Sequence, residues 1–281
     1  MVSKKVSFLF FFVFLSIAQS SPQKIPYKIT PQDTLHLFVF QPDSAAQTGS
    51  AIVFFFGGGW VQGNPKQFFS HCQYLASRGM VAFSAEYRIK NRHGTTPFEC
   101  VQDGISAVRW VRAHANEFQI DPQKIVAAGG SAGGHVAACT AFTPNLQSAD
   151  IDTTIPSVPN AMVLFNPVVN TGPNGFGAKR IGKDAIKISP MHHIKFGRPP
   201  TIIFHGTADT TVPFEQVERF CLKMRKAGNT CRLVPFEGMQ HAFFNVGRHD
   251  NKPYQKTITL MDEFLTQLHF LSESGHSFNQ E

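Results

Sequence analysis

The sequence carries little charge, and its basic residues are scattered. Lys and Arg number 26 against 19 Asp and Glu, giving a formal net charge of +7, without a run of five or six basic residues. Such a small excess of basic residues, scattered along the chain, does not indicate a nucleic-acid partner. Metal spacing is also lacking, because the five cysteines are isolated and the adjacent His192 and His193 have no third ligand at a useful distance. We therefore expect neither a nucleic acid nor a metal.

Long hydrophobic runs, internal repeats and low-complexity tracts are absent beyond the first twenty residues. Without an apolar run of about 20 residues, stable membrane insertion is not expected. With 42% hydrophobic residues the chain of 281 residues can bury a substantial core. Because single α/β domains commonly reach roughly 250 residues, we expect one domain over residues 21–281.

The first twenty residues have a composition of their own. Lys4 and Lys5 precede an apolar run of thirteen residues at 6–18, and Ala18 and Ser20 supply the small residues of a cleavage site. This pattern predicts a signal peptide over residues 1–20 and a secreted or periplasmic protein. Retention of the run as an uncleaved anchor is the alternative, although the run is shorter than a transmembrane helix requires.

The five cysteines are an odd number, so at least one stays unpaired in an exported protein. Cys221 and Cys231 flank the end of a predicted helix and the start of the next strand, which makes them candidates for a disulfide. Cys139 lies in a predicted helix and is interpreted as a small core residue. Pairing among the others, Cys72 and Cys100, stays open.

Short apolar runs alternate with longer helical patterns along the chain. This alternation predicts a mostly parallel sheet with helices on both faces, where reactive groups collect in the loops beyond the carboxyl ends of the strands. Strands are predicted at residues 35–40, 51–56, 80–85, 124–128, 161–165, 201–204 and 232–236, and helices at 65–77, 97–115, 134–142, 214–227 and 254–270.

A glycine-rich turn joins the predicted strand 124–128 to the helix that follows it. Residues 129–133 read Gly-Gly-Ser-Ala-Gly, which fits the G-x-S-x-G nucleophile elbow in its required strand-turn-helix context. Small neighbours let the strand and the helix approach each other, so Ser131 is the predicted nucleophile. A phosphate-binding loop is the alternative, but the Gly-Lys-Ser/Thr ending of such loops is absent.

A serine hydroxyl needs a base to accept its proton and a carboxylate to orient that base. Asp209 lies just after the predicted strand 201–204, and His241 just after the strand 232–236. The chain order serine, acid, histidine is that of the nucleophile-elbow hydrolases. Asp209 is preferred to the other acidic residues on this placement, although it could instead cap the helix 214–227. The other eleven histidines lie in elements or lack this context.

A negative oxygen that develops during acyl transfer requires backbone N–H donors. Gly57 and Gly58 follow a predicted strand, where residues without side chains can aim their amides at the site. The N–H of Ala132, next to Ser131, is expected to add a further donor. A plain flexible glycine turn is the alternative at residues 57–59.

Taken together, these residues resemble the esterase and lipase branch of the α/β-hydrolase superfamily related to hormone-sensitive lipase, and more closely its small acetyl esterases and acetylxylan esterases. The resemblance runs from about residue 35 to 270. It implies a central, mostly parallel sheet of eight strands, a serine esterase mechanism and no cofactor. Its anchors are Gly-Gly-Gly-Trp at 57–60, Glu-Tyr-Arg at 86–88, Asp-Pro at 121–122, Ser-Ala-Gly-Gly-His at 131–135, His-Gly at 205–206 with Asp209, and His241.

The chain departs from this family at two places. Phe56 stands where the family usually has a histidine before the glycines, which puts the geometry of that loop in question. Only residues 170–200 are available for a lid, so we expect a minimal lid and an open site, lined by Trp60 and Phe176. Open sites suit short acyl groups on bulky alcohols such as polysaccharides. The substrate's alcohol, the acyl length and the oligomeric state stay open.

Two other interpretations remain. A serine peptidase similar to the prolyl oligopeptidase catalytic domain shares the fold and the order of the triad, but usually carries an N-terminal propeller. Plant gibberellin receptors resemble the same family without being enzymes, and they have lost the histidine that His241 supplies here.

Overall fold

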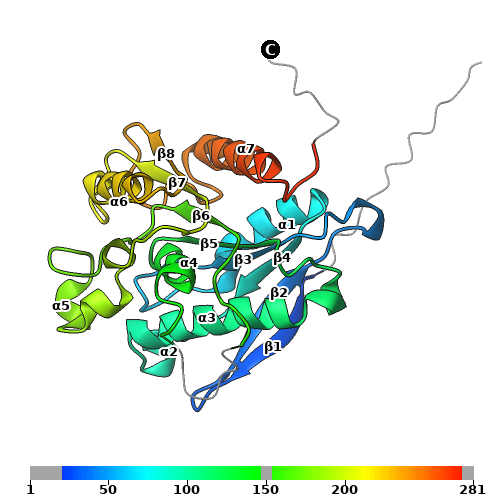
Figure 1. Ribbon diagram of the computed structural model, residues 1–281, viewed down its shortest axis with the longest axis horizontal. Coiled ribbons are helices and arrows are strands. Elements are labelled where there is room, and N and C mark those ends of the chain that lie inside the picture. Colours follow the sequence, from blue (N-terminus) through cyan, green and yellow to red (C-terminus); the bar gives the residue numbers. More distant parts are fainter. Residues whose placement is uncertain (1–20, 147–153, 274–281) are drawn as a thin grey trace, which may run out of the picture.

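The computed structural model describes residues 21–146 and 154–273 (Figure 1). The predicted signal peptide, residues 1–20, lies outside these ranges. Within them, no helix is both long enough and apolar enough to cross a membrane. The strands are β1 (Gln23–Ile29), β2 (Thr34–Phe40), β3 (Ala51–Phe55), β4 (Val81–Ala85), β5 (Ile125–Gly130), β6 (Ala161–Phe165), β7 (Thr201–Gly206) and β8 (Cys231–Phe236).

The helical segments alternate with these strands. The α-helices are α1 (Phe69–Ser77), α2 (Lys90–His93), α3 (Pro97–Ala113), α4 (Ala132–Phe142), α5 (Ala178–Ile181), α6 (Phe214–Lys226) and α7 (Lys252–Gln267). Short 3-10 turns lie at Ser44–Ala46, Pro65–Phe68, Ala115–Phe118, Ala185–Ile188, Pro190–His192 and His249–Asn251. The helix predicted over residues 65–77 is therefore a 3-10 turn followed by α1.

The eight strands form one sheet in the order β1-β2-β4-β3-β5-β6-β7-β8. β1, β2 and β4 pair antiparallel, and all strands from β4 through β3 to β8 pair parallel. All seven predicted strands are present. β1 is the strand that the sequence patterns missed, because this edge strand is mostly exposed and contains Pro26.

Helices cover both faces of the sheet (Figure 1). Alternate side chains of β3 point to opposite faces: Val53 and Phe55 join the core beneath α3, α4 and α6, while Ile52 and Phe54 join the core beneath α1 and α7. Because both faces are buried, the central strands read as continuous apolar runs rather than alternating ones. Because β3, β5, β6, β7 and β8 pair parallel, their carboxyl ends lie at one edge of the sheet.

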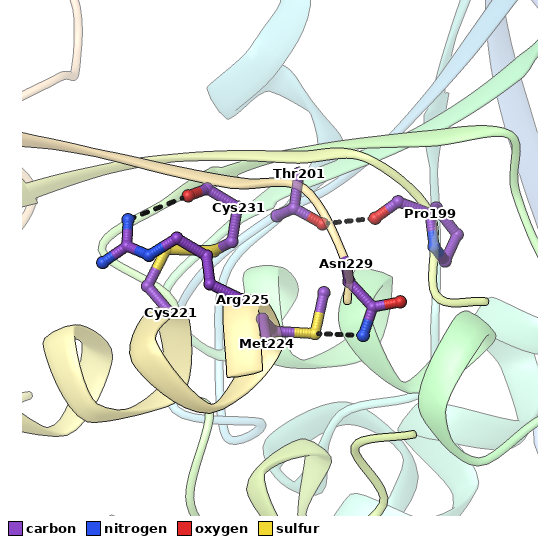
Figure 2. Close-up of a disulfide and its surroundings, with 7 residues drawn as sticks. All are labelled: Pro199, Thr201, Cys221, Met224, Arg225, Asn229 and Cys231. Atoms are coloured by element: carbon purple, nitrogen blue, oxygen red, sulfur yellow. Dashed lines mark hydrogen bonds between the residues drawn. A yellow bond between two sulfur atoms is a disulfide. The ribbon is translucent and has the colours of Figure 1, made fainter. Parts of the chain in front are cut away.

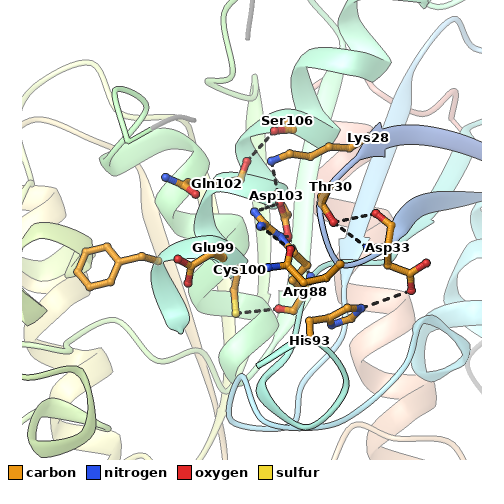
Figure 3. Close-up of polar contacts among 12 residues, drawn as sticks. Lys28, Thr30, Asp33, Arg88, His93, Glu99, Cys100, Gln102, Asp103 and Ser106 are labelled. Carbon is orange, nitrogen blue, oxygen red and sulfur yellow. Dashed lines mark hydrogen bonds and ion pairs between the residues drawn. The ribbon is translucent and has the colours of Figure 1, made fainter. Parts of the chain in front are cut away.

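An ion cluster fastens the β1–β2 hairpin to α3 (Figure 3). The fully buried carboxylate of Asp103 accepts two hydrogen bonds from the guanidinium of Arg88, both at 2.8 Å, and one from Nζ of Lys28 at 2.7 Å. The backbone N–H of Arg88 donates to the same carboxylate at 2.9 Å. A buried charge needs such partners, so the Glu-Tyr-Arg run at 86–88 has a structural role here.

A disulfide joins α6 to β8 (Figure 2). Cys221 and Cys231 are bonded with their Cα atoms 5.5 Å apart, which confirms this candidate pair. The carbonyl of Cys231 also accepts a hydrogen bond from the Arg225 guanidinium at 3.2 Å. Cys72, Cys100 and Cys139 are buried free thiols, as expected for Cys139.

Candidate active site

Ser131 occupies the sharp turn between β5 and α4. Its backbone has φ 54° and ψ −119°, a conformation that L residues rarely adopt, and its N–H donates to the carbonyl of Phe165 at 2.9 Å. The glycines around it are required by close packing. A Cβ on Gly133 would lie 2.1 Å from the carbonyl oxygen of Phe55, and one on Gly129 would lie 2.5 Å from the carbonyl oxygen of Gly133. The strain is held in place by these backbone contacts.

His241 and Asp209 reach Ser131 from the loops after β8 and β7. Nε2 of His241 lies 2.8 Å from Oγ of Ser131, and Nδ1 of His241 lies 2.7 Å from Oδ2 of Asp209. The structure therefore brings the three sequence-predicted residues into one hydrogen-bonded relay. With Nδ1–H donating to the carboxylate, Nε2 is left as the acceptor for the serine hydroxyl.

The carboxylate of Asp209 is nearly fully buried and held in its charged form. Its Oδ1 accepts the backbone N–H groups of Thr211 and Val212, both at 2.9 Å. Burial alone would raise the pKa of Asp209, but the hydrogen bonds from His241 and from the Val212 amide outweigh burial and lower it. The acid therefore stays ionised and able to orient the imidazole.

A second histidine supports the acid loop. His205 is fully buried at the end of β7, and its Nε2 lies 2.8 Å from the carbonyl oxygen of Val212 and 3.3 Å from Oδ2 of Asp209. Burial, followed by the nearby His241, lowers the pKa of His205 despite the opposing effects of these two partners. His205 is thus neutral, and its Nε2–H donates to the carbonyl of Val212.

The glycine loop after β3 lies against the elbow. A Cβ on Gly57 would be 3.4 Å from Cβ of Ser131. Gly57, one of the three donors expected from the sequence, is already engaged. Its N–H donates to Oε1 of Gln67 at 2.6 Å. Among the described residues, no partner is found for the N–H groups of Gly58 and Ala132, so these two remain able to bind an oxyanion.

Phe56 anchors this loop in place of the family's histidine. Its ring stacks on Tyr87 with centroids 4.2 Å apart, and the Tyr87 hydroxyl donates to the carbonyl of Phe56 at 2.6 Å. Both side chains are buried. The departure at this position is therefore accommodated by an aromatic pair that fixes the start of the loop.

Trp60 and Phe176 are in contact, with ring centroids 5.5 Å apart. Trp60 is only 1% exposed, so it does not line an open surface as expected, whereas Phe176 is half-buried. The Trp60 ring contacts His135 of α4, with ring centroids 5.1 Å apart, and its centroid lies 5.2 Å from the guanidinium carbon of Arg180. The segment around α5 therefore packs over Trp60, and a cavity of about 500 Å³ lies along residues 174–180.

Sequence reasoning missed Asn166, which follows β6. Its Oδ1 accepts the N–H of Ala242, the residue after His241, at 2.9 Å. A lone asparagine at a strand end has no motif that would reveal such a role. Within the described ranges, no group of three or more His, Cys, Asp or Glu side chains is arranged to hold a metal ion.

The chain is similar to known esterases. Residues 37–178 match the BD-FAE family model. The apo structure of Thermogutta terrifontis esterase 2 is 51% identical with a TM-score of 0.87, over 91% of this chain and 98% of that one. The same esterase is known phosphonylated by sarin and with butyrate bound.

Curated sequences give more distant matches. Esterase LipC from Mycobacterium tuberculosis is 25% identical over 81% of this chain, and an acetylxylan esterase from Xylanibacter ruminicola is 25% identical over 82%. The chain spans 60% of the length of the first and 48% of the second. The resemblance to esterases expected from the motifs is confirmed by these matches.

Proposed function

Because the chain belongs to the BD-FAE family and has the α/β-hydrolase fold, we propose that it hydrolyses carboxylic esters through an acyl-enzyme on Ser131. The observation that carries the proposal is the relay of Ser131, His241 and Asp209, with separations of 2.8 Å and 2.7 Å. Both lie within the reach that proton transfer between a nucleophile and its base requires.

The reaction runs in two halves. Oγ of Ser131 adds to the ester carbonyl carbon while its proton passes to Nε2 of His241, and the carbonyl oxygen becomes an oxyanion. His241 then gives this proton to the departing alcohol, and the acyl group stays on Ser131. Water repeats the sequence and releases the carboxylic acid. Asp209 keeps its charge throughout and stabilises the imidazolium.

The oxyanion is bound by the N–H groups of Gly58 and Ala132. Loss of one such donor typically costs about 2.7–4 kcal/mol of transition-state stabilisation. Gly57 supports the loop through Gln67 instead of donating to the substrate.

For the substrate we infer a short acyl ester of a hydrophilic alcohol, such as an acetyl group on a polysaccharide. A cavity of about 540 Å³ beside Gly57 and Gly58 is lined otherwise by Gln62, Gly63, Asn64, Lys66 and Gln67. Apart from the glycines, every side chain of this lining is polar, which suits hydroxyl groups rather than an alkyl chain. The relative named as an acetylxylan esterase supports the same class.

We also infer secretion, directed by residues 1–20. The Cys221–Cys231 disulfide suits an oxidising compartment. N-terminal sequencing of the exported protein is expected to begin at residue 21, and a product that keeps residues 1–20 would contradict cleavage.

An active-site label tests the chemistry. An organophosphonate should add to Ser131 in the wild type, read as a mass shift on the peptide that contains it, and Ser131→Ala should neither be labelled nor hydrolyse aryl acetates. A protein that binds acetylated xylan without releasing acetate would instead be a binding protein. Preference for acyl chains of ten or more carbons, compared across aryl esters, would overturn the short-acyl assignment.

A further inference from the structure

Two side-chain amides connect the loop of Gly57 to the loop of His241. Gln67, in the 3-10 turn before α1, accepts the Gly57 N–H through Oε1 at 2.6 Å. Its Nε2 donates to Oδ1 of Asn245 at 2.9 Å, and Nδ2 of Asn245 donates to the carbonyl of Ala242 at 3.1 Å. The path therefore begins on the main chain beside Ser131 and ends on the main chain beside His241.

The direction of every bond along this path is fixed. A backbone N–H can only donate, so the oxygen of the Gln67 amide must face Gly57 and its NH₂ must face Asn245. Asn245 consequently turns its oxygen to Gln67 and its NH₂ to the Ala242 carbonyl. Neither amide can rotate by half a turn without placing two like groups against each other, so the two loops are held in one relative position.

Ala242 needs such support, because its backbone is left-handed with φ 63°. This conformation costs an alanine roughly 1–2 kcal/mol. Its carbonyl is held by Asn245 and its N–H by Oδ1 of Asn166 at 2.9 Å. The two peptide units that flank Ala242 are thus each held by a side chain, and the first of them is joined directly to His241.

We propose that Gln67 and Asn245 are positioning residues for ester hydrolysis: they set the separation between the oxyanion loop and the His241 loop. The inference rests on the proposed function. The N–H of Gly58 and Nε2 of His241 must act on the same reacting ester, one on the carbonyl oxygen and the other on the serine proton. Misplacement of a catalytic group by about 1 Å can cost about 100-fold in rate.

The test uses Gln67→Leu, Asn245→Leu and the double variant with an aryl acetate. Each single change is expected to lower kcat by between about 10 and 100-fold, with KM within about twofold, because the transition state depends on the alignment more than substrate binding does. The double variant should lose no more than the poorer single one, since both act in one network. The rate of phosphonylation of Ser131 should fall in parallel with kcat.

Gln47→Leu is the matched control. Gln47 also uses its side-chain NH₂ to bind a main-chain carbonyl, that of Phe118 at 2.5 Å, but it lies outside the site. This variant should keep the wild-type kcat. Thermal unfolding is followed for every variant, and if a leucine variant does not fold, Gln67→Glu and Asn245→Asp replace it because they keep the shape of the side chain while breaking one bond of the path.

Several results would overturn the inference. Unchanged kcat in both single variants, additive losses in the double variant, or a loss confined to KM would each show that the path does not position the reacting groups. A rise in kcat for Gln67→Leu would show that Gln67 masks a useful Gly57 donor. Absence of esterase activity in the wild type, or its persistence in Ser131→Ala, would instead contradict the proposed function.

Discussion

His205 and His241 share one carboxylate oxygen: Oδ2 of Asp209 lies 3.3 Å from Nε2 of the first and 2.7 Å from Nδ1 of the second. The neutral His205 also holds the loop of Asp209 through the Val212 carbonyl. The acid is thus positioned by a group that takes no part in proton transfer.

His205→Leu is therefore expected to weaken both the fold and the activity. Loss of the donor leaves the buried Val212 carbonyl unpaired, which should cost about 1–3 kcal/mol of unfolding free energy. A looser Asp209 should lower kcat about tenfold, with the two amides of residues 211 and 212 limiting the loss. Denaturant unfolding and aryl acetate kinetics measure the two effects. His193→Leu, whose ring lies outside the relay, is the control, and equal effects in both variants would contradict the role of His205.

Stability is predicted to fall in acid because of His71. This fully buried imidazole sits among Phe68, Phe165 and Tyr254, with ring centroids 5.0–5.3 Å away, and neither ring nitrogen has a hydrogen-bond partner within the described part of the chain. Burial lowers the pKa of His71 to about 3. In the unfolded chain histidine titrates near about 6.5, so between these values the unfolded state binds a proton that the folded state does not.

The free energy of unfolding therefore falls as the pH falls between these two values. As pH falls below about 6.5, each unit should remove about 1.4 kcal/mol of unfolding free energy through His71, until its folded-state pKa is reached. His71→Leu, of similar volume, should remove this part of the slope. Chemical denaturation between pH 7 and pH 4 measures it, and identical slopes for the variant and the wild type would contradict the assignment. Part of the acid slope should survive in the variant, because burial also lowers the pKa of His135 to about 4.

How far the sequence predicted this site depends on whether the interactions are local. Around Ser131 the strand, turn and helix are contiguous, so the small residues at 129–133 were enough to indicate the elbow. The loops of Asp209 and His241 were predictable because the carboxyl ends of parallel strands must share an edge of the sheet. β1 was missed because its exposed residues show neither a buried run nor a clean alternation.

Contacts between loops could not be predicted in the same way. The partner of the Gly57 N–H is Gln67, and the choice between donating to Gln67 and donating to substrate depends on a turn whose path no pattern reveals. The sequence predicts that Trp60 lines an open site. In the structure the segment around α5 covers its ring. Such outcomes depend on how irregular segments pack, which periodicity does not encode.

Gly133 is predicted to tolerate no side chain. In Gly133→Ala the new Cβ would lie 2.1 Å and 2.2 Å from the carbonyl oxygens of Phe55 and Phe56, so β3 or α4 must shift. We expect a loss of about 3 kcal/mol in unfolding free energy and loss of esterase activity, because the same movement displaces the oxyanion loop. The control is Gly197→Ala, where φ is 81° and no atom lies within 4 Å of the added Cβ. That variant should cost only about 1 kcal/mol, from its left-handed backbone alone, and stay active. Similar losses in both variants would show that the close approach of the Phe55 and Phe56 carbonyls does not govern Gly133.

The Tyr87 hydroxyl offers a test of the aromatic anchor that replaces the family's histidine. Tyr87→Phe keeps the ring that stacks on Phe56 and removes only the hydrogen bond to the Phe56 carbonyl. The loss should cost about 1–3 kcal/mol of stability, because that buried carbonyl becomes unpaired. It should also lower kcat severalfold by loosening the loop that carries Gly58, with KM little changed. Tyr74→Phe, which removes a hydroxyl bonded to Asp262 outside the site, should lose stability without losing kcat. If the two variants lowered kcat equally, the Phe56–Tyr87 pair would have no particular part in holding the oxyanion loop.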